Sequence, residues 1–220
     1  MSTAIIVHVH TNHSEGSVLT TQAPDSRIIT LSDIEAGLLT YEYRTRREAK
    51  PGRWAGVVAM LRVASKGAEV LLIRRTEHPN DPWSGHMAMP GGRAKDSDPS
   101  IQHTAERETL EEVAIDLTKT GRYLGRLDDV TAVARGRMLD LTIATCVYHV
   151  EDHVSPVANP AEVQEVVWIP LNDLTGHQYR SVLTYEHESV AIKLPCWRWN
   201  DRVIWGLTYN MLEALIHIGH

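Results

Sequence analysis

Three glutamates on one face of a predicted helix constrain this chain more than any other feature of its sequence. Glu108, Glu111 and Glu112 are spaced i, i+3 and i+4, so their carboxylates project from neighbouring points of one helical face. Like charges at this spacing repel each other, and a purely structural helix should avoid them. The repulsion is removed when a hard divalent cation such as Mg²⁺ or Mn²⁺ lies among the oxygens. The pattern therefore indicates a metal-binding helix, with a solvated acidic helix as the alternative.

A glycine turn precedes this helix. Residues 89–92 read Met-Pro-Gly-Gly, and fourteen residues separate Gly92 from Arg107. Adjacent glycines let the backbone approach a ligand closely, so their amides or carbonyls can contact a metal ion or a phosphate. Arg107 stands four residues before Glu111 and can brace that carboxylate by an i,i+4 ion pair. The turn and the acidic helix together favour a binding site over a solvated helix.

The predicted helix has a start signal and an apolar face. Asp98 is expected to be its N-cap and Pro99 its first residue, because both residue types are preferred at those positions. The predicted inward-facing residues are Ile101, Ala105, Thr109, Leu110 and Val113. The glutamates are expected to face away from this stripe.

The stretch from Gly92 to Ile115 resembles the Nudix box of the Nudix hydrolases, G-x5-E-x7-R-E-U-x-E-E-x-G-U, in which U is a bulky aliphatic residue. The positions that match are Gly92, Arg107, Glu108, Glu111, Glu112 and Ile115. Asp98 occupies the first glutamate position, and the gap from there to Arg107 is one residue longer than in the pattern. Thr109 replaces the aliphatic residue, and Ala114 replaces the glycine near the helix end, where a left-handed cap is less favourable. None of these departures touches the three glutamates.

The resemblance implies an α/β (α+β) fold, an α/β/α sandwich with a mixed β-sheet. It also implies hydrolysis of a diphosphate that links a nucleoside to another group, with Mg²⁺ or Mn²⁺ as cofactor. Glu108 and Glu112 are then the predicted metal ligands, together with the carbonyl of Gly91. Glu111 is expected to ligate directly or through water, and Arg107 to orient the carboxylates.

Residues outside the helix supply further candidates. Arg74 and Arg75 end a predicted strand and can contact phosphate, although strand alternation lets only one of them face the site. Glu162 and Glu165 are candidates for a general base, but surface carboxylates flanking a strand are the simpler interpretation. Trp197, Trp199 and Trp205 can stack on a base, but core or interface packing is the simpler interpretation.

Several segments resemble the coenzyme A diphosphatase branch of the family in part. They are Leu71–Thr76, Ser84–Met89, Thr104–Thr109 and Ile204–Leu212. Lys95 stands where that branch carries an aspartate, and His86 follows Gly85 instead of preceding a glycine by two residues. Coenzyme A or an acyl derivative is the first expected substrate. The alternatives are ADP-ribose, a dinucleotide or an oxidised nucleoside triphosphate. A non-catalytic nucleotide-binding module is a third reading, which the retained glutamates disfavour.

Composition limits the remaining possibilities. The chain has 220 residues and a formal net charge of −6, which argues against a nucleic-acid scaffold. Cys146 and Cys196 are too few for a disulfide framework and are expected to be free buried thiols. No signal peptide and no run of about 18–20 apolar residues is evident, so no membrane contact and a cytoplasmic protein are expected.

The pattern of helices and strands divides the chain at residue 50. Residues 1–50 are predicted to be an N-terminal extension docked on the main domain, with a strand at Ala4–His10 and a helix at Asp33–Ala49 opened by Ser32 and Glu35. This extension can dock a second subunit and form a homodimer. Residues 51–220 are predicted to be the Nudix domain. Its expected strands are Trp54–Val63, Glu69–Arg75, Gly121–Asp129, Leu139–Val150, Val163–Pro170, Val182–Tyr185 and Val190–Trp197, and its further helices are Leu171–Thr175 and Gly206–Ile218.

Overall fold

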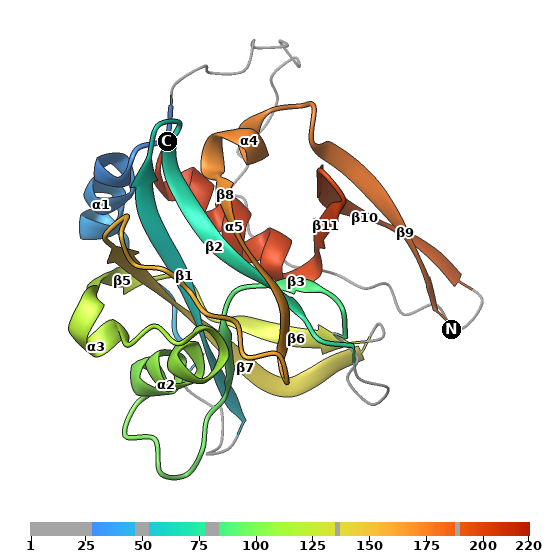
Figure 1. Ribbon diagram of the computed structural model, residues 1–220. Coiled ribbons are helices and arrows are strands. Elements are labelled where there is room, and N and C mark those ends of the chain that lie inside the picture. The colour runs from blue at the N-terminus through green and yellow to red at the C-terminus, as the bar shows by residue number, and fades with distance from the viewer. Residues whose placement is uncertain (1–27, 47–52, 78–83, 135–136, 188–189) are drawn as a thin grey trace.

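The computed structural model describes residues 28–46, 53–77, 84–134, 137–187 and 190–220 (Figure 1). The strand predicted at Ala4–His10 lies outside these residues. The helices are α1 (Leu31–Thr40), α2 (Ile101–Val113), α3 (Leu117–Thr120), α4 (Leu171–Thr175) and α5 (Gly206–Ile218). The strands are β1 (Trp54–Ala64), β2 (Gly67–Arg75), β3 (Met87–Ala88), β4 (Gly91–Arg93), β5 (Gly121–Arg126), β6 (Val130–Ala134), β7 (Arg137–Val150), β8 (Val163–Pro170), β9 (Arg180–His187), β10 (Val190–Trp199) and β11 (Arg202–Trp205).

Eight of the described strands form one mixed sheet. Its main path runs β3-β2-β1-β7-β5, while β4 pairs with β1, β6 with β7 and β8 with β2. The β1–β7 pair is parallel and the other pairs are antiparallel. Strands β9, β10 and β11 form a separate three-stranded sheet. The predicted α/β sandwich with a mixed sheet is confirmed.

Alternation along the central strands separates two hydrophobic clusters. Val58 and Met60 of β1 pack with Ala105 and Val113 of α2, whereas the intervening Ala59 belongs to a second cluster. The second cluster contains the buried face of α5: Met211, Leu212, Leu215 and Ile216. Because successive side chains of a strand point to opposite faces, α2 and α5 cover opposite faces of the sheet. Figure 1 shows the two helices in these positions.

A glycine lets α2 lie directly on β1. A Cβ atom at Gly56 would come within 2.6 Å of the Ile101 carbonyl oxygen and 2.9 Å of the Ala105 amide nitrogen. The first turns of α2 therefore rest on the backbone of the strand. This contact sets the height of the helix above the sheet, and with it the position of the glutamates.

The start and the apolar face of α2 differ from the expectation. Ser100 is the N-cap, since its hydroxyl accepts a hydrogen bond from the His103 amide, and the helix begins at Ile101. The predicted N-cap Asp98 and first residue Pro99 are therefore wrong. Leu110 is 47% exposed and is not part of the inward face. Ala114 adopts the left-handed conformation, with φ of 57°, although it lacks the freedom of glycine.

The helix in the N-terminal region is shorter than predicted. It runs from Leu31 to Thr40, and its capping box consists of Thr30 and Asp33 instead of Ser32 and Glu35. Beyond it, backbone amides bond to acidic side chains of the loop that follows β5: Arg44 N–H to Asp128 and Arg46 N–H to Asp129. These bonds replace helical ones and keep residues 41–46 out of the helix. Helix α1 contacts α5 and β5 of its own chain. The boundary at residue 50 and the docking of a second subunit stay predictions.

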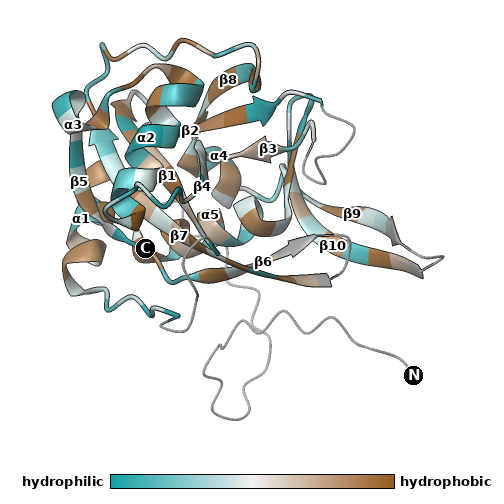
Figure 2. Ribbon diagram, turned by 90° about the horizontal axis from the view of Figure 1, so that it is seen from below, coloured by the Kyte–Doolittle hydropathy of each residue, from teal (hydrophilic) through white to brown (hydrophobic). Residues whose placement is uncertain are grey.

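Most other predicted elements are present. The predicted ranges Val163–Pro170, Leu171–Thr175 and Gly206–Ile218 coincide with β8, α4 and α5, whereas α3, β3, β4, β6 and β11 were not predicted. Cys146 and Cys196 are free and buried, as expected. Within the described residues, no helix is long and apolar enough to cross a membrane. Hydropathy colouring shows the alternation of polar and apolar residues along the strands (Figure 2).

Replacing Gly56 by alanine should destabilise the protein by about 1–3 kcal/mol, because the added methyl group must displace α2 from β1. Urea unfolding followed by circular dichroism measures the change in the free energy of unfolding. Gly176→Ala is the matched control, since the nearest atom to a Cβ at Gly176 is 3.6 Å away. Equal stability of the two variants would contradict a tight contact between α2 and β1.

Candidate active site

The last turns of α2 face the two glycines that begin β4. Glu112 has only 1% of its surface exposed, and its carboxylate accepts a hydrogen bond of 2.8 Å from the backbone amide of Gly91. Burial raises the pKa of Glu112 to about 8, although the Gly91 hydrogen bond and the charge of Arg75 act in the opposite direction. The charges of Glu108 and Glu162 raise it further. Burial and the two neighbouring negative charges therefore make ionisation of Glu112 unfavourable.

A side chain at position 92 would displace the carboxylate of Glu108. A Cβ atom at Gly92 would lie 2.4 Å from one oxygen of Glu108. The carboxylate of Glu108 therefore lies against the bare backbone of β4, and any side chain would displace it. Desolvation raises the pKa of Glu108, while the hydrogen bond from Arg107 lowers it. The two glycines thus serve two different glutamates: Gly91 donates to Glu112, and Gly92 makes room for Glu108.

Glu111 lies at the exposed rim of this group. Its side chain is 42% exposed and accepts hydrogen bonds from Lys95 at 3.2 Å and from Arg107 at 3.1 Å. Desolvation raises its pKa, but these two cationic donors outweigh that effect and lower the pKa overall. The predicted i,i+4 pair between Arg107 and Glu111 is therefore present. The contact with Lys95 was not predicted, because the side chain comes from the loop sixteen residues earlier.

Arg107 connects the loop to the helix. Its guanidinium donates to both oxygens of Asp98, at 2.9 and 3.0 Å, and also to Glu108, to Glu111 and to the Arg93 carbonyl. The hydrogen bonds from Arg107 hold the pKa of Asp98 well below its usual range. Asp98 also accepts from the Lys95 amide and the Thr104 hydroxyl. Because its carboxylate binds Arg107, Asp98 does not cap the helix. The sequence signal for this contact was the place of Asp98 in the first glutamate position of the motif.

The two adjacent arginines of β2 point to different places. Arg75 approaches Glu112, with 3.9 Å between the guanidinium and the carboxylate. Arg74 lies on the other side of the strand, where it pairs with Glu165 and Asp201. As alternation predicts, only one of the two faces the glutamates.

The two candidates for a general base, Glu162 and Glu165, lie in different places. Glu165 accepts from Arg202 and Arg74, so it belongs to that ion-pair cluster. Glu162 is exposed and close enough to raise the pKa of Glu112 by its charge. The structure therefore brings Glu108, Glu111, Glu112, Arg107, Arg75 and Glu162 into one region and leaves Arg74 and Glu165 in another.

The donor set fits a hard divalent cation. Carboxylate and carbonyl oxygens are the ligands that Mg²⁺ and Mn²⁺ prefer, and a cation would relieve the repulsion that acts on Glu112. In the part of the chain that the structure describes, no three acidic, histidine or cysteine side chains are already arranged around one point. The glutamates instead accept hydrogen bonds from Arg107, Lys95 and Gly91, so these contacts must rearrange when a cation binds.

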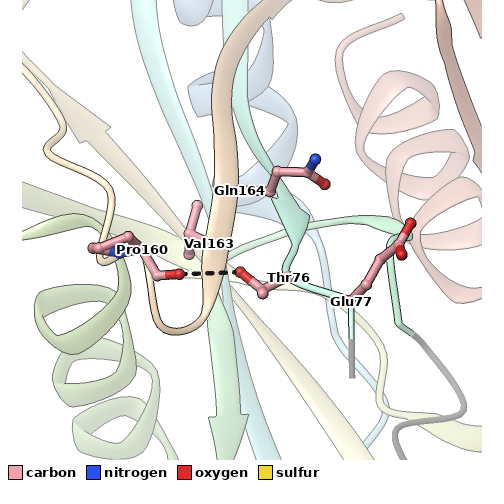
Figure 3. Close-up of a pocket in the computed structure, with 5 residues that line it drawn as sticks. All are labelled: Thr76, Glu77, Pro160, Val163 and Gln164. Carbon is pink, nitrogen blue, oxygen red and sulfur yellow. Dashed lines mark hydrogen bonds between the residues drawn. The ribbon is translucent and has the colours of Figure 1, made fainter. Parts of the chain in front are cut away.

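A hollow of about 420 Å³ lies between the end of β2 and the start of β8. It is lined by Thr76, Glu77, Pro160, Val163 and Gln164. Figure 3 shows the Thr76 hydroxyl directed at the Pro160 carbonyl oxygen, 3.4 Å away. Thr76 directly follows Arg75, and the Asn159 amide bonds to the Glu112 carbonyl oxygen. The hollow therefore flanks the glutamate region, and sequence reasoning did not identify Asn159.

Asp98→Asn should lower the free energy of unfolding by about 1–3 kcal/mol at pH 7, since it removes the charge that Arg107 binds through two hydrogen bonds. The folded-state pKa of Asp98 lies below its unfolded value of about 3.9. Its stabilising contribution is therefore complete above that value and is lost as the pH falls through the folded pKa. The difference between wild type and variant should shrink below about pH 4. Asp96→Asn, in the same loop, is the control, and a pH-independent difference would contradict the assignment.

Comparison with known proteins supports the resemblance noted in the sequence. The family model described as the NUDIX domain matches residues 52–187. An uncharacterized protein of Schizosaccharomyces pombe is 41% identical over 107 residues, which cover 48% of this chain but only 32% of that protein. The Nudix hydrolase NudL of Yersinia pestis, also described as uncharacterized, is 30% identical over 147 residues, or 66% of this chain and 70% of NudL.

Solved structures resemble this chain more distantly. A binary complex of the Caenorhabditis elegans Ap4A hydrolase has a TM-score of 0.46 and 19% identity, covering 55% of this chain and 82% of that one. A MutT/nudix family protein from Enterococcus faecalis has a TM-score of 0.46 and 20% identity, covering 84% of this chain and 68% of its own. These similarities do not indicate a substrate. The match of the family model over most of the sequence shows that this chain belongs to the Nudix family.

Proposed function

We propose that this protein hydrolyses the diphosphate linkage of a nucleoside diphosphate derivative with the help of Mg²⁺ or Mn²⁺. The observation that carries the proposal is the buried carboxylate of Glu112, which is held by the Gly91 amide beside Glu108 and has a pKa raised to about 8. A buried carboxylate with raised pKa lowers the stability of the fold, so it is expected where it serves a function. Family membership, and relatives named Nudix hydrolases, support the hydrolase class.

The residues of the glutamate region would have distinct roles in this reaction. Glu108, Glu112 and the Gly91 carbonyl would hold the metal ions, with Glu111 binding directly or through water. Bound Mg²⁺ or Mn²⁺ would neutralise phosphate charge and make water a better nucleophile. Arg107 keeps Glu108 and Glu111 in place through its hydrogen bonds. Arg75 is close enough to Glu112 to contact a phosphate bound there.

Glu162 is the better of the two candidates for a general base. Glu165 is engaged by Arg202 and Arg74, which stabilise its charge away from the glutamate region. Glu162 has an exposed side chain near Glu112, so a water molecule between them can lose its proton to it.

Coenzyme A or an acyl derivative is the first proposed substrate, on the partial resemblance of Leu71–Thr76, Ser84–Met89 and Thr104–Thr109 to that branch. ADP-ribose, a dinucleotide or an oxidised nucleoside triphosphate is the alternative within the same chemistry. A non-catalytic nucleotide-binding module is disfavoured, because a protein that only binds would have no need of the clustered carboxylates.

Product analysis with Mg²⁺ and with Mn²⁺ tests the proposal across coenzyme A, acetyl-CoA, ADP-ribose, NADH, diadenosine polyphosphates and 8-oxo-dGTP. Coenzyme A is expected to yield 3′,5′-ADP and phosphopantetheine. Glu112→Gln should reduce the rate by more than about 100-fold, because it removes a charged ligand. The melting temperature should stay close to that of wild type, since burial already favours the neutral form of this side chain.

Glu106→Gln is the matched control for this experiment. Glu106 is on the same helix but bonds to the Tyr148 hydroxyl on the side facing β7, so its variant should retain activity. Preferential cleavage of another compound would replace coenzyme A and leave the mechanism intact. Nucleotide binding without any hydrolysis would favour the non-catalytic module.

A further inference from the structure

A second hollow, of about 230 Å³, lies between β3 and β11. Trp205 forms part of its wall, with Met87 and His86 from β3 and the residue before it. The indole of Trp205 is half-buried and is fixed by two aromatic neighbours: His86, with ring centroids 4.9 Å apart, and Tyr185, at 5.5 Å. An aromatic ring held in this way offers a rigid apolar surface to a planar ligand.

Charged groups complete the rim of this hollow. Arg74 and Asp201 both line it, and they lie 3.6 Å apart. Asp201 also accepts from Arg202, while Glu165 pairs with both arginines. This cluster joins β2 and β8 to the turn between β10 and β11, so it fixes the two walls relative to each other. Asp201 is 72% exposed and keeps oxygen lone pairs for a donor on a ligand.

The hollow is connected to the glutamate region by four residues of chain. Met87 lines it, and Gly91 donates to Glu112. An extended chain rises at most about 3.3–3.6 Å per residue, so the two points lie within about 14 Å of each other. The Thr208 hydroxyl donates to the Met87 carbonyl oxygen and ties this segment to α5. This separation is short enough for one elongated ligand to span both places.

A hollow with an aromatic wall and an exposed carboxylate at its rim suits a ligand group that is planar, aromatic and carries a hydrogen-bond donor on its edge. A nucleobase with an exocyclic amino group meets all three requirements: it stacks on an aromatic ring, and its amine donates to a carboxylate. We propose that the hollow between β3 and β11 binds the amino-bearing base of the substrate, with Trp205 as the stacking surface and Asp201 as the acceptor. This inference rests on the proposed function, because it names the part of a nucleotide substrate that lies there.

The two residues that would contact the base lie outside the part of the chain that matches the family, whereas Arg74, His86 and Met87 of the same hollow lie inside it. The family model ends at residue 187, whereas Asp201 and Trp205 follow it. The stacking surface and the acceptor would therefore come from β11 and the turn before it, and the glutamate chemistry from the matched part.

Calorimetric titration of the full chain with AMP and with ribose 5-phosphate, in Mg²⁺ buffer, tests the inference without requiring turnover. Wild type should bind AMP more tightly than ribose 5-phosphate. Trp205→Leu should weaken AMP binding by about 10-fold or more and leave ribose 5-phosphate unchanged, because only the base loses its stacking partner. Trp199→Leu is the matched control, since Trp199 bonds to Asp173 and does not line the hollow.

Asp201→Asn provides a second variant at an exposed position, in case Trp205→Leu fails to fold. It should remove the preference of wild type for AMP over IMP, which lacks the amino group. Equal affinity of wild type for AMP and ribose 5-phosphate, or unchanged AMP affinity in both variants, would overturn the inference even if diphosphates are hydrolysed. Loss of AMP discrimination in the variants would uphold it even if no diphosphate is cleaved, in which case the proposed function alone fails.

Discussion

The guanidinium of Arg107 is the interaction on which the site depends. It binds Asp98, Glu108, Glu111 and the Arg93 carbonyl, so one cation joins the loop after β4 to the helix that carries the glutamates. Without it, the carboxylates on that face would lose the cation that bridges Glu108 and Glu111 and would repel one another more strongly. The contact of Gly56 with α2 fixes the height of the helix, and Arg107 then fixes what the loop and the helix present to each other.

Local patterns predicted the parts of the fold that local forces determine. Strand β8 and helices α4 and α5 have the predicted bounds, because alternation and the period of the apolar stripe are properties of short segments. The predicted helix at Asp33–Ala49 failed beyond Thr40, where Asp128 and Asp129 capture the backbone amides of Arg44 and Arg46. Those partners lie more than eighty residues away in the sequence, and no local pattern contains them.

In the candidate site, too, the features set by local spacing were predicted and those set by distant contacts were not. Helical spacing placed the three glutamates on one face, and the i,i+4 pair of Arg107 with Glu111 followed from it. Spacing does not distinguish the buried Glu112 from the exposed Glu111, because that difference arises from the glycine turn packed over one end of the face. The contact of Lys95 with Glu111 depends on the path of a loop. The ion pair between Asp98 and Arg107 forms although their spacing is one residue longer than in the sequence pattern.

Strands β9, β10 and β11 form a sheet of their own, and ion pairs among Arg74, Glu165, Asp201 and Arg202 connect it to β2 and β8. An attachment made of side chains can change by point substitutions, whereas a backbone ladder changes only with the register of whole strands. Among the described strands, β9, β10 and β11 have backbone ladders only with one another, so a change within them leaves the register of the larger sheet as it is. The two sheets are thus independent in their backbone pairing, although Trp197 and Ile204 bury their side chains in the core of the larger one.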